Sequence, residues 1–106
     1  MGQTIPKEKN ALKLGILGAA RINDMAILKP SSQLASIKVE AIASRDISKA
    51  ERLCSKWAIP KVFGGEDAYD KLLADKDIEA IYIPLPNSLH CQYVVKALQA
   101  GFPKNE

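Results

Sequence analysis

The chain has 106 residues, enough for one domain with a single hydrophobic core. Its composition, 47% hydrophobic and 25% charged, is typical of globular proteins, and a net charge of +3 is too small to indicate a nucleic-acid-binding surface. No segment reaches the roughly 18 consecutive apolar residues that a membrane span needs, which argues against a membrane protein.

The chain begins with a polar and charged segment, residues 1–10. It lacks the apolar core of a secretory signal, and we expect it to be a loose leader. The next segment, "LKLGIL" at residues 12–17, is a short apolar run typical of a strand buried on both faces. A short helix is predicted over residues 22–28. It must end near Lys29, because Pro30 disfavours helical geometry in the residue before it.

The middle of the chain predicts a strand followed by a helix. "IKVEAIA", residues 37–43, is apolar and rich in β-branched residues, which favours a strand. The helix after it has two candidate N-caps: Ser48, which forms a capping-box spacing with Glu51, and Asp46, which we prefer. Four residues with helical spacing then predict its buried face: Ala50, Leu53, Cys54 and Trp57.

Two more strands and two more helices complete the alternation. The strands are predicted at residues 61–63 and 78–83, and the helices at residues 66–75 and 88–101. The last helix is capped by Asn87 or Ser88 and closed by Gly101. Such alternation implies right-handed crossovers and a parallel sheet of the α/β class, a three-layer Rossmann-like half with strand order 3-2-1-4.

Both cysteines, Cys54 and Cys91, fall within apolar helical patterns and match no metal-ligand spacing. We therefore expect buried free thiols, no metal site, and a reducing, cytoplasmic compartment. The single histidine, His90, is too few for a histidine-based metal site.

The turn after the first strand is a candidate phosphate-binding loop. In the dinucleotide fingerprint G-x-G-x-x-G, Gly18 fills the first position, whereas Ala20 and Asn23 stand in the second and third. Free N–H groups at the start of the next helix would still attract a pyrophosphate. The pattern alone leaves a plain strand-to-helix turn as the alternative.

Two further motifs follow strand ends on the same edge of the sheet, where doubly wound proteins bind ligands. Ser44 and Arg45 offer a hydroxyl and a guanidinium, which suit a 2′-phosphate and therefore NADP better than NAD or S-adenosylmethionine. In "PLPNSLH", Asn87 and His90 are three residues apart and can both face the ligand cleft. The alternatives are a solvated Arg45 and a His90 that packs between helices.

The segments "LGILGAARI", "AIASRD", "AIYIPLPNSLH" and "ALQAG" resemble, in this order and spacing, the N-terminal Rossmann domain of the Gfo/Idh/MocA oxidoreductase family. The resemblance is strongest to its NADP-dependent dihydrodiol and D-xylose dehydrogenase branch, and it assigns residues 11–101 to an NAD(P)-binding domain. It implies that eleven residues bind the cofactor: Gly18, Ala19, Ala20, Arg21, Ile22, Ser44, Arg45, Leu85, Pro86, Asn87 and His90.

The last five residues, 102–106, do not resemble the family, whose fifth strand and Glu-Lys-Pro motif are expected there. Lys104 follows Pro103 in the wrong order, so we assign no catalytic residue. We expect an NADP(H)-binding domain that lacks the lysine and the substrate domain needed for hydride transfer to or from a sugar or trans-diol. For this chain we therefore expect weak or no NADP(H) binding and no turnover. The alternative is a non-catalytic fragment that self-associates through the exposed edge of its fourth strand.

Overall fold

The computed structural model describes residues 6–19, 27–85 and 87–103. Its strands form one parallel sheet in the order β3-β2-β1-β4, which confirms the predicted topology. The strands are β1 (Leu12–Leu17), β2 (Ile37–Ser44), β3 (Lys61–Gly64) and β4 (Ala80–Tyr82). The helices are α1 (Lys29–Ser32), α2 (Ile47–Trp57), α3 (Ala68–Leu73) and α4 (Asn87–Gln99). Within these ranges no helix is long and apolar enough to cross a bilayer.

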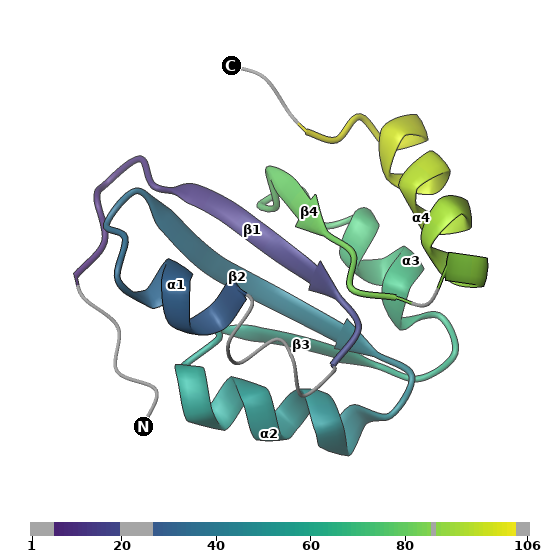
Figure 1. Cartoon of the computed structure of the whole chain (residues 1–106), viewed down its shortest axis with the longest axis horizontal. Helices are drawn as coiled ribbons and strands as arrows, with labels where there is room; N and C mark the ends of the chain where they lie inside the picture. The colour runs from purple at the N-terminus through teal and green to yellow at the C-terminus, as the bar shows by residue number, and fades with distance from the viewer. Residues whose placement is uncertain (1–5, 20–26, 86, 104–106) are drawn as a thin grey trace.

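Helices cover both faces of the sheet (Figure 1), so the domain has two hydrophobic cores. On one face, Ile16 and Ile42 of the sheet pack against Leu53 and Trp57 of α2. On the other face, Leu17 and the β2 alanines pack against α3 and α4. The predicted inner face of α2 is confirmed for Ala50, Leu53 and Trp57, which are buried.

A β-bulge at Glu40 shifts the register between β1 and β2. Leu14 pairs with Val39, but Gly15 pairs with Ala41, so Glu40 is the extra residue of β2. Because of the shift, Val39 packs in the α2 layer while Ala41 packs in the α3 layer, although strict alternation would place both on one face. Beyond the bulge, Leu17 pairs with Ala43, which brings the two strand ends level.

The helix termini correct the expected effect of Pro30 and confirm Asp46 as the preferred cap of α2. Pro30 does not stop a helix at Lys29: it lies in the first turn of α1, where its missing N–H costs nothing. Asp46 caps α2 by accepting a hydrogen bond from the Ser48 backbone N–H at 3.1 Å, so Ser48 lies inside the helix and is not its cap. Helix α4 begins at Asn87 and also contains Ser88.

Helix α4 ends at Gln99, and the predicted closing glycine, Gly101, follows two residues later with a φ of +95°. The N–H groups of Gly101 and Phe102 donate to the carbonyl oxygens of Leu98 and Ala97, at 3.0 Å each, in the pattern of a Schellman motif. This end places Phe102 in the core beside Ala97.

The thiols differ in environment, and the prediction that both are buried is wrong for Cys91, which is exposed. Cys54 is half-buried on α2 and donates a weak hydrogen bond to the Lys61 carbonyl oxygen, with an S···O distance of 3.8 Å. Burial, with a smaller contribution from the Glu51 charge, raises the pKa of the Cys54 thiol to about 11.

Candidate functional site

An open groove of about 310 Å³ lies at the carboxyl ends of β1 and β2, beside the segment that follows β4. Strand order 3-2-1-4 places the switch point of the sheet beside β1, because β2 and β3 are added on one side of β1 and β4 on the other. The groove is lined by residues from five segments of the chain: Gly18, Ala19, Ser44, Arg45, Asp46, Lys49, Tyr69, Pro84 and Leu85.

Gly18 lines the groove at the end of β1. Its φ of +117° lies in a region that L-residues with a side chain rarely adopt. A Cβ atom at this position would also lie 3.0 Å from Cδ2 of Leu85. Glycine is therefore required here both by the backbone conformation and by the close approach of the segment after β4.

Ser44 and Asp46 organise the end of β2. The buried Ser44 hydroxyl accepts a hydrogen bond from the Asp46 N–H at 3.1 Å, which fixes the turn into α2. The Asp46 carboxylate accepts from both the backbone N–H and the hydroxyl of Ser48, at 3.1 and 2.6 Å. The Ser48 hydrogen bond, opposed by slight desolvation, holds the pKa of Asp46 below its ordinary value.

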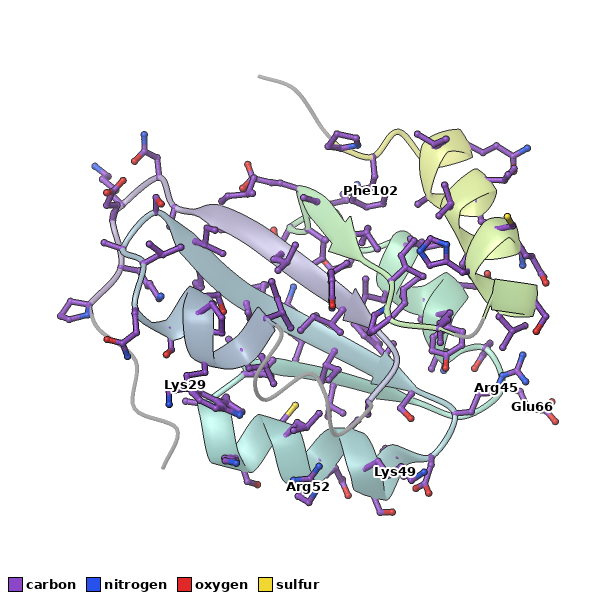
Figure 2. The ribbon with its side chains drawn as sticks, in the orientation of Figure 1. Lys29, Arg45, Lys49, Arg52, Glu66 and Phe102 are labelled. Carbon is purple, nitrogen blue, oxygen red and sulfur yellow. The ribbon has the colours of Figure 1, made fainter. Side chains whose placement is uncertain are left out.

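Two exposed cations, Arg45 and Lys49, line the same side of the groove. Arg45 was a candidate from the sequence, whereas Lys49, in the first turn of α2, was not. Figure 2 shows both side chains at the carboxyl end of β2 and the adjoining first turns of α2. Such a pair offers charge-assisted hydrogen bonds to an anion.

Tyr69 of α3 also lines the groove and was not a candidate from the sequence. It is buried, and its ring centroid lies 5.9 Å from the guanidinium carbon of Arg45. Burial raises the pKa of the Tyr69 hydroxyl, against the opposing effects of the Arg45 guanidinium and backbone amide.

The candidate residues from the sequence divide into those that line the groove, those of α4 and those outside the described ranges. Leu85 lines the groove, together with Gly18, Ala19, Ser44 and Arg45, so these five meet as expected. His90 is exposed in the first turns of α4 and does not line the groove, and its exposure rules out packing between helices. Asn87 is the first residue of α4. Four residues lie outside the described ranges: Ala20, Arg21, Ile22 and Pro86.

The sequence also matches known proteins. A model of the oxidoreductase family with an NAD-binding Rossmann fold, Gfo/Idh/MocA, matches residues 12–103. D-xylose 1-dehydrogenase (NADP(+)) 2 of Haloferax volcanii is 39% identical over 90 residues, which are 85% of this chain and 26% of that protein. Trans-1,2-dihydrobenzene-1,2-diol dehydrogenase of Mus musculus is 35% identical over 92 residues, which are 86% of this chain and 27% of that enzyme.

Among solved structures, the 3-ketoreductase KijD10 of Actinomadura kijaniata, in complex with TDP-benzene and NADP, aligns with a TM-score of 0.78 and 34% identity. The alignment covers 87% of this chain and 28% of KijD10. The chain therefore spans about a quarter of the length of the relatives it matches. Since the family model covers most of the sequence, this chain belongs to the Gfo/Idh/MocA oxidoreductase family and has the NAD-binding Rossmann fold of its members.

Proposed function

We propose that the groove binds NADP(H), with the pyrophosphate at the turn after β1 and the 2′-phosphate at the end of β2. The observation that carries the proposal is that one groove joins the Gly18 turn to two exposed cations, Arg45 and Lys49. A pyrophosphate needs close approach to backbone N–H groups, which the missing side chain of Gly18 allows. A 2′-phosphate needs cations, which Arg45 and Lys49 supply.

NADP is favoured over NAD because the acid near the end of β2 is already engaged. NAD specificity uses a carboxylate that accepts from the ribose hydroxyls. Here the side chain of Asp46 accepts two hydrogen bonds from Ser48 at the start of α2. Two relatives support the same choice: the Haloferax volcanii dehydrogenase is named for NADP(+), and the Actinomadura kijaniata reductase was solved in complex with NADP.

The remaining contacts follow from the family resemblance. Ala19, Ala20, Arg21 and Ile22 would continue the pyrophosphate loop, and Ser44 would join Arg45 at the 2′-phosphate. Near the nicotinamide we place Leu85, which lines the groove, and the three residues Pro86, Asn87 and His90. When bound, the cofactor supplies a hydride donor or acceptor.

For the full-length relatives of this domain we propose hydride transfer to or from a sugar or trans-diol carbon. No residue of this chain is matched to the lysine of the family's Glu-Lys-Pro motif. We therefore propose that residues 1–106 alone bind the cofactor without turnover. We further propose a reducing, cytoplasmic compartment, which the free thiols Cys54 and Cys91 favour.

The test is a fluorescence titration with NADPH and NADH, run beside a turnover assay on sugars and trans-diols. We expect tighter binding of NADPH, and an Arg45→Gln variant that loses about tenfold or more of its NADPH affinity while its NADH affinity is retained. Arg52→Gln is the matched control, because Arg52 is an exposed arginine of the adjoining helix α2 that does not line the groove. Equal affinity for the two cofactors in the unmodified chain, or turnover by it, would contradict the proposal.

A second candidate function, self-association, is favoured by the edge of the sheet. Within the described residues β4 pairs only with β1, which leaves its other edge without a partner strand. An apolar groove of about 240 Å³ runs between this strand and α4, and Leu98 on its rim is 62% exposed. Size-exclusion chromatography with light scattering tests this by measuring the oligomeric state with and without NADPH. Association of two copies is supported if the unmodified chain is a dimer and the Leu98→Glu variant is a monomer under both conditions.

A further inference from the structure

The aromatic ring of Tyr69 connects Arg45, at the proposed 2′-phosphate site, with the helix layer on the opposite face of the sheet from α2. Tyr69 belongs to α3, whereas Arg45 follows β2 on the way to α2. The guanidinium carbon of Arg45 nevertheless lies 5.9 Å from the centroid of the Tyr69 ring, within the range of a cation–π interaction. One end of the contact is exposed and the other is buried, since Tyr69 is only 5% exposed.

The ring is held in place by a second tyrosine. Tyr93 of α4 packs edge-on against Tyr69, with centroids 5.0 Å apart and an interplanar angle of 79°. Tyr93 is itself 4% exposed and belongs to the same core cluster. Such an edge-to-face pair fixes the orientation of both rings. The face that Tyr69 presents to Arg45 is therefore part of the rigid core.

An exposed arginine ordinarily samples many rotamers, and binding an anion restricts it to one of them. A fixed ring face beneath the guanidinium removes part of this cost before the anion arrives. Resting on the proposed NADP(H) function, we propose that Tyr69 is a positioning residue for cofactor specificity: it holds Arg45 at the 2′-phosphate site and thereby raises the preference for NADPH over NADH.

The first experiment measures the position of Arg45 without any cofactor. In an NMR spectrum of the free protein, the Arg45 side-chain N–H and methylene signals should be displaced by the ring current of Tyr69. The displacement should persist in Tyr69→Phe, which keeps the ring, and disappear in Tyr69→Leu. Arg45 signals at random-coil positions in the unmodified chain would overturn the proposal, whether or not the variants fold.

The second experiment measures specificity. Tyr69→Leu should lower the ratio of NADPH to NADH affinity about twofold to fivefold, the range expected for an exposed cation–π contact. Tyr69→Phe should restore the ratio, and in an Arg45→Gln background Tyr69→Leu should have no further effect on it. Phe102→Leu is the control for lost core packing, because Phe102 is equally buried in the same cluster but distant from Arg45 (Figure 2).

The outcomes separate the two proposals. Equal losses of NADPH and NADH affinity in Tyr69→Leu would assign Tyr69 a purely structural role and overturn the inference while leaving NADP(H) binding intact. If the unmodified chain binds neither cofactor, the proposed function fails, and the ring-current displacement alone then decides whether Tyr69 positions Arg45.

Discussion

The backbone N–H of Gly18 donates a hydrogen bond to the carbonyl oxygen of Ala43, with an N···O distance of 2.7 Å. The bond extends the pairing of β1 and β2 one residue beyond Leu17 and places the turn after β1 directly beside Ser44. At the same residue, φ is +117° and a Cβ would crowd Leu85. The first strand, the second strand and the segment after β4 thus meet at Gly18.

Gly18→Ala should therefore weaken both folding and cofactor binding. A side chain at this φ costs about 1–3 kcal/mol of unfolding free energy, and the new methyl group displaces Leu85. The measurements are urea unfolding and NADPH titration. Gly101→Ala is the matched control: its φ is +95°, but a Cβ there meets no atom within 4 Å. The Gly101→Ala variant should lose stability and keep its NADPH affinity. If Gly18→Ala also keeps its NADPH affinity, the turn at Gly18 is not part of the cofactor site.

We predict that Asp46 makes part of the free energy of unfolding depend on pH in the acid range. Its folded-state pKa is lowered, mainly by the hydrogen bond from Ser48, so its carboxylate stabilises the folded state above the unfolded-state pKa of about 3.9. This contribution is lost as the pH falls through the folded-state pKa. Asp46→Asn keeps an oxygen that can cap α2 but cannot titrate. The gap in urea midpoint between the two proteins should narrow below about pH 4, and a gap that stays constant from pH 7 to pH 3 would contradict the assignment.

The sequence predicted the topology and the place of the site because both depend on local patterns. Alternating strands and helices imply parallel crossovers, and parallel strands bring their carboxyl ends to one edge. Gly18, Ser44 and Leu85 could therefore be grouped before any contact was known. Their meeting in one groove is the consequence of strand order 3-2-1-4.

Three features could not be predicted because they depend on packing between distant segments. The bulge at Glu40 leaves no trace in "IKVEAIA", where apolar residues on both faces hide a slip in the period of two. The contact between Arg45 and Tyr69 joins residues of different layers, and no sequence spacing encodes it. The exposure of Cys91 follows from α4, which is apolar on several sides but buries only the side of Tyr93 and Ala97.

The two thiols should react at very different rates. Cys91 is exposed, whereas Cys54 is half-buried with a pKa raised to about 11, so at pH 8 only about one Cys54 thiol in a thousand is ionised. A disulfide reagent at pH 8 should label one thiol per native chain rapidly and the second only after denaturation. Cys91→Ser should abolish the fast phase, and a fast phase that survives this change would show that Cys54 is accessible.

The tight packing of Gly15 against Leu72 predicts coupling between β1 and α3. A Cβ on Gly15 would lie 2.7 Å from Cδ2 of Leu72, so Gly15→Ala should cost about 1–3 kcal/mol by overpacking. Leu72 is fully buried, and Leu72→Ala should cost about 2–5 kcal/mol through the cavity it leaves. In the double variant the new methyl group occupies part of that cavity, so the combined loss in urea unfolding should be smaller than the sum.

The control for this coupling is Leu53→Ala. Leu53 is also fully buried, but it lies in the core on the other face of the sheet from Leu72. Its cost should add to that of Gly15→Ala within about 0.5 kcal/mol, as expected for independent sites. If the losses of unfolding free energy for Gly15→Ala and Leu72→Ala add equally well, β1 and α3 accommodate the methyl group independently. The approach of α3 would then not be the reason for glycine at position 15.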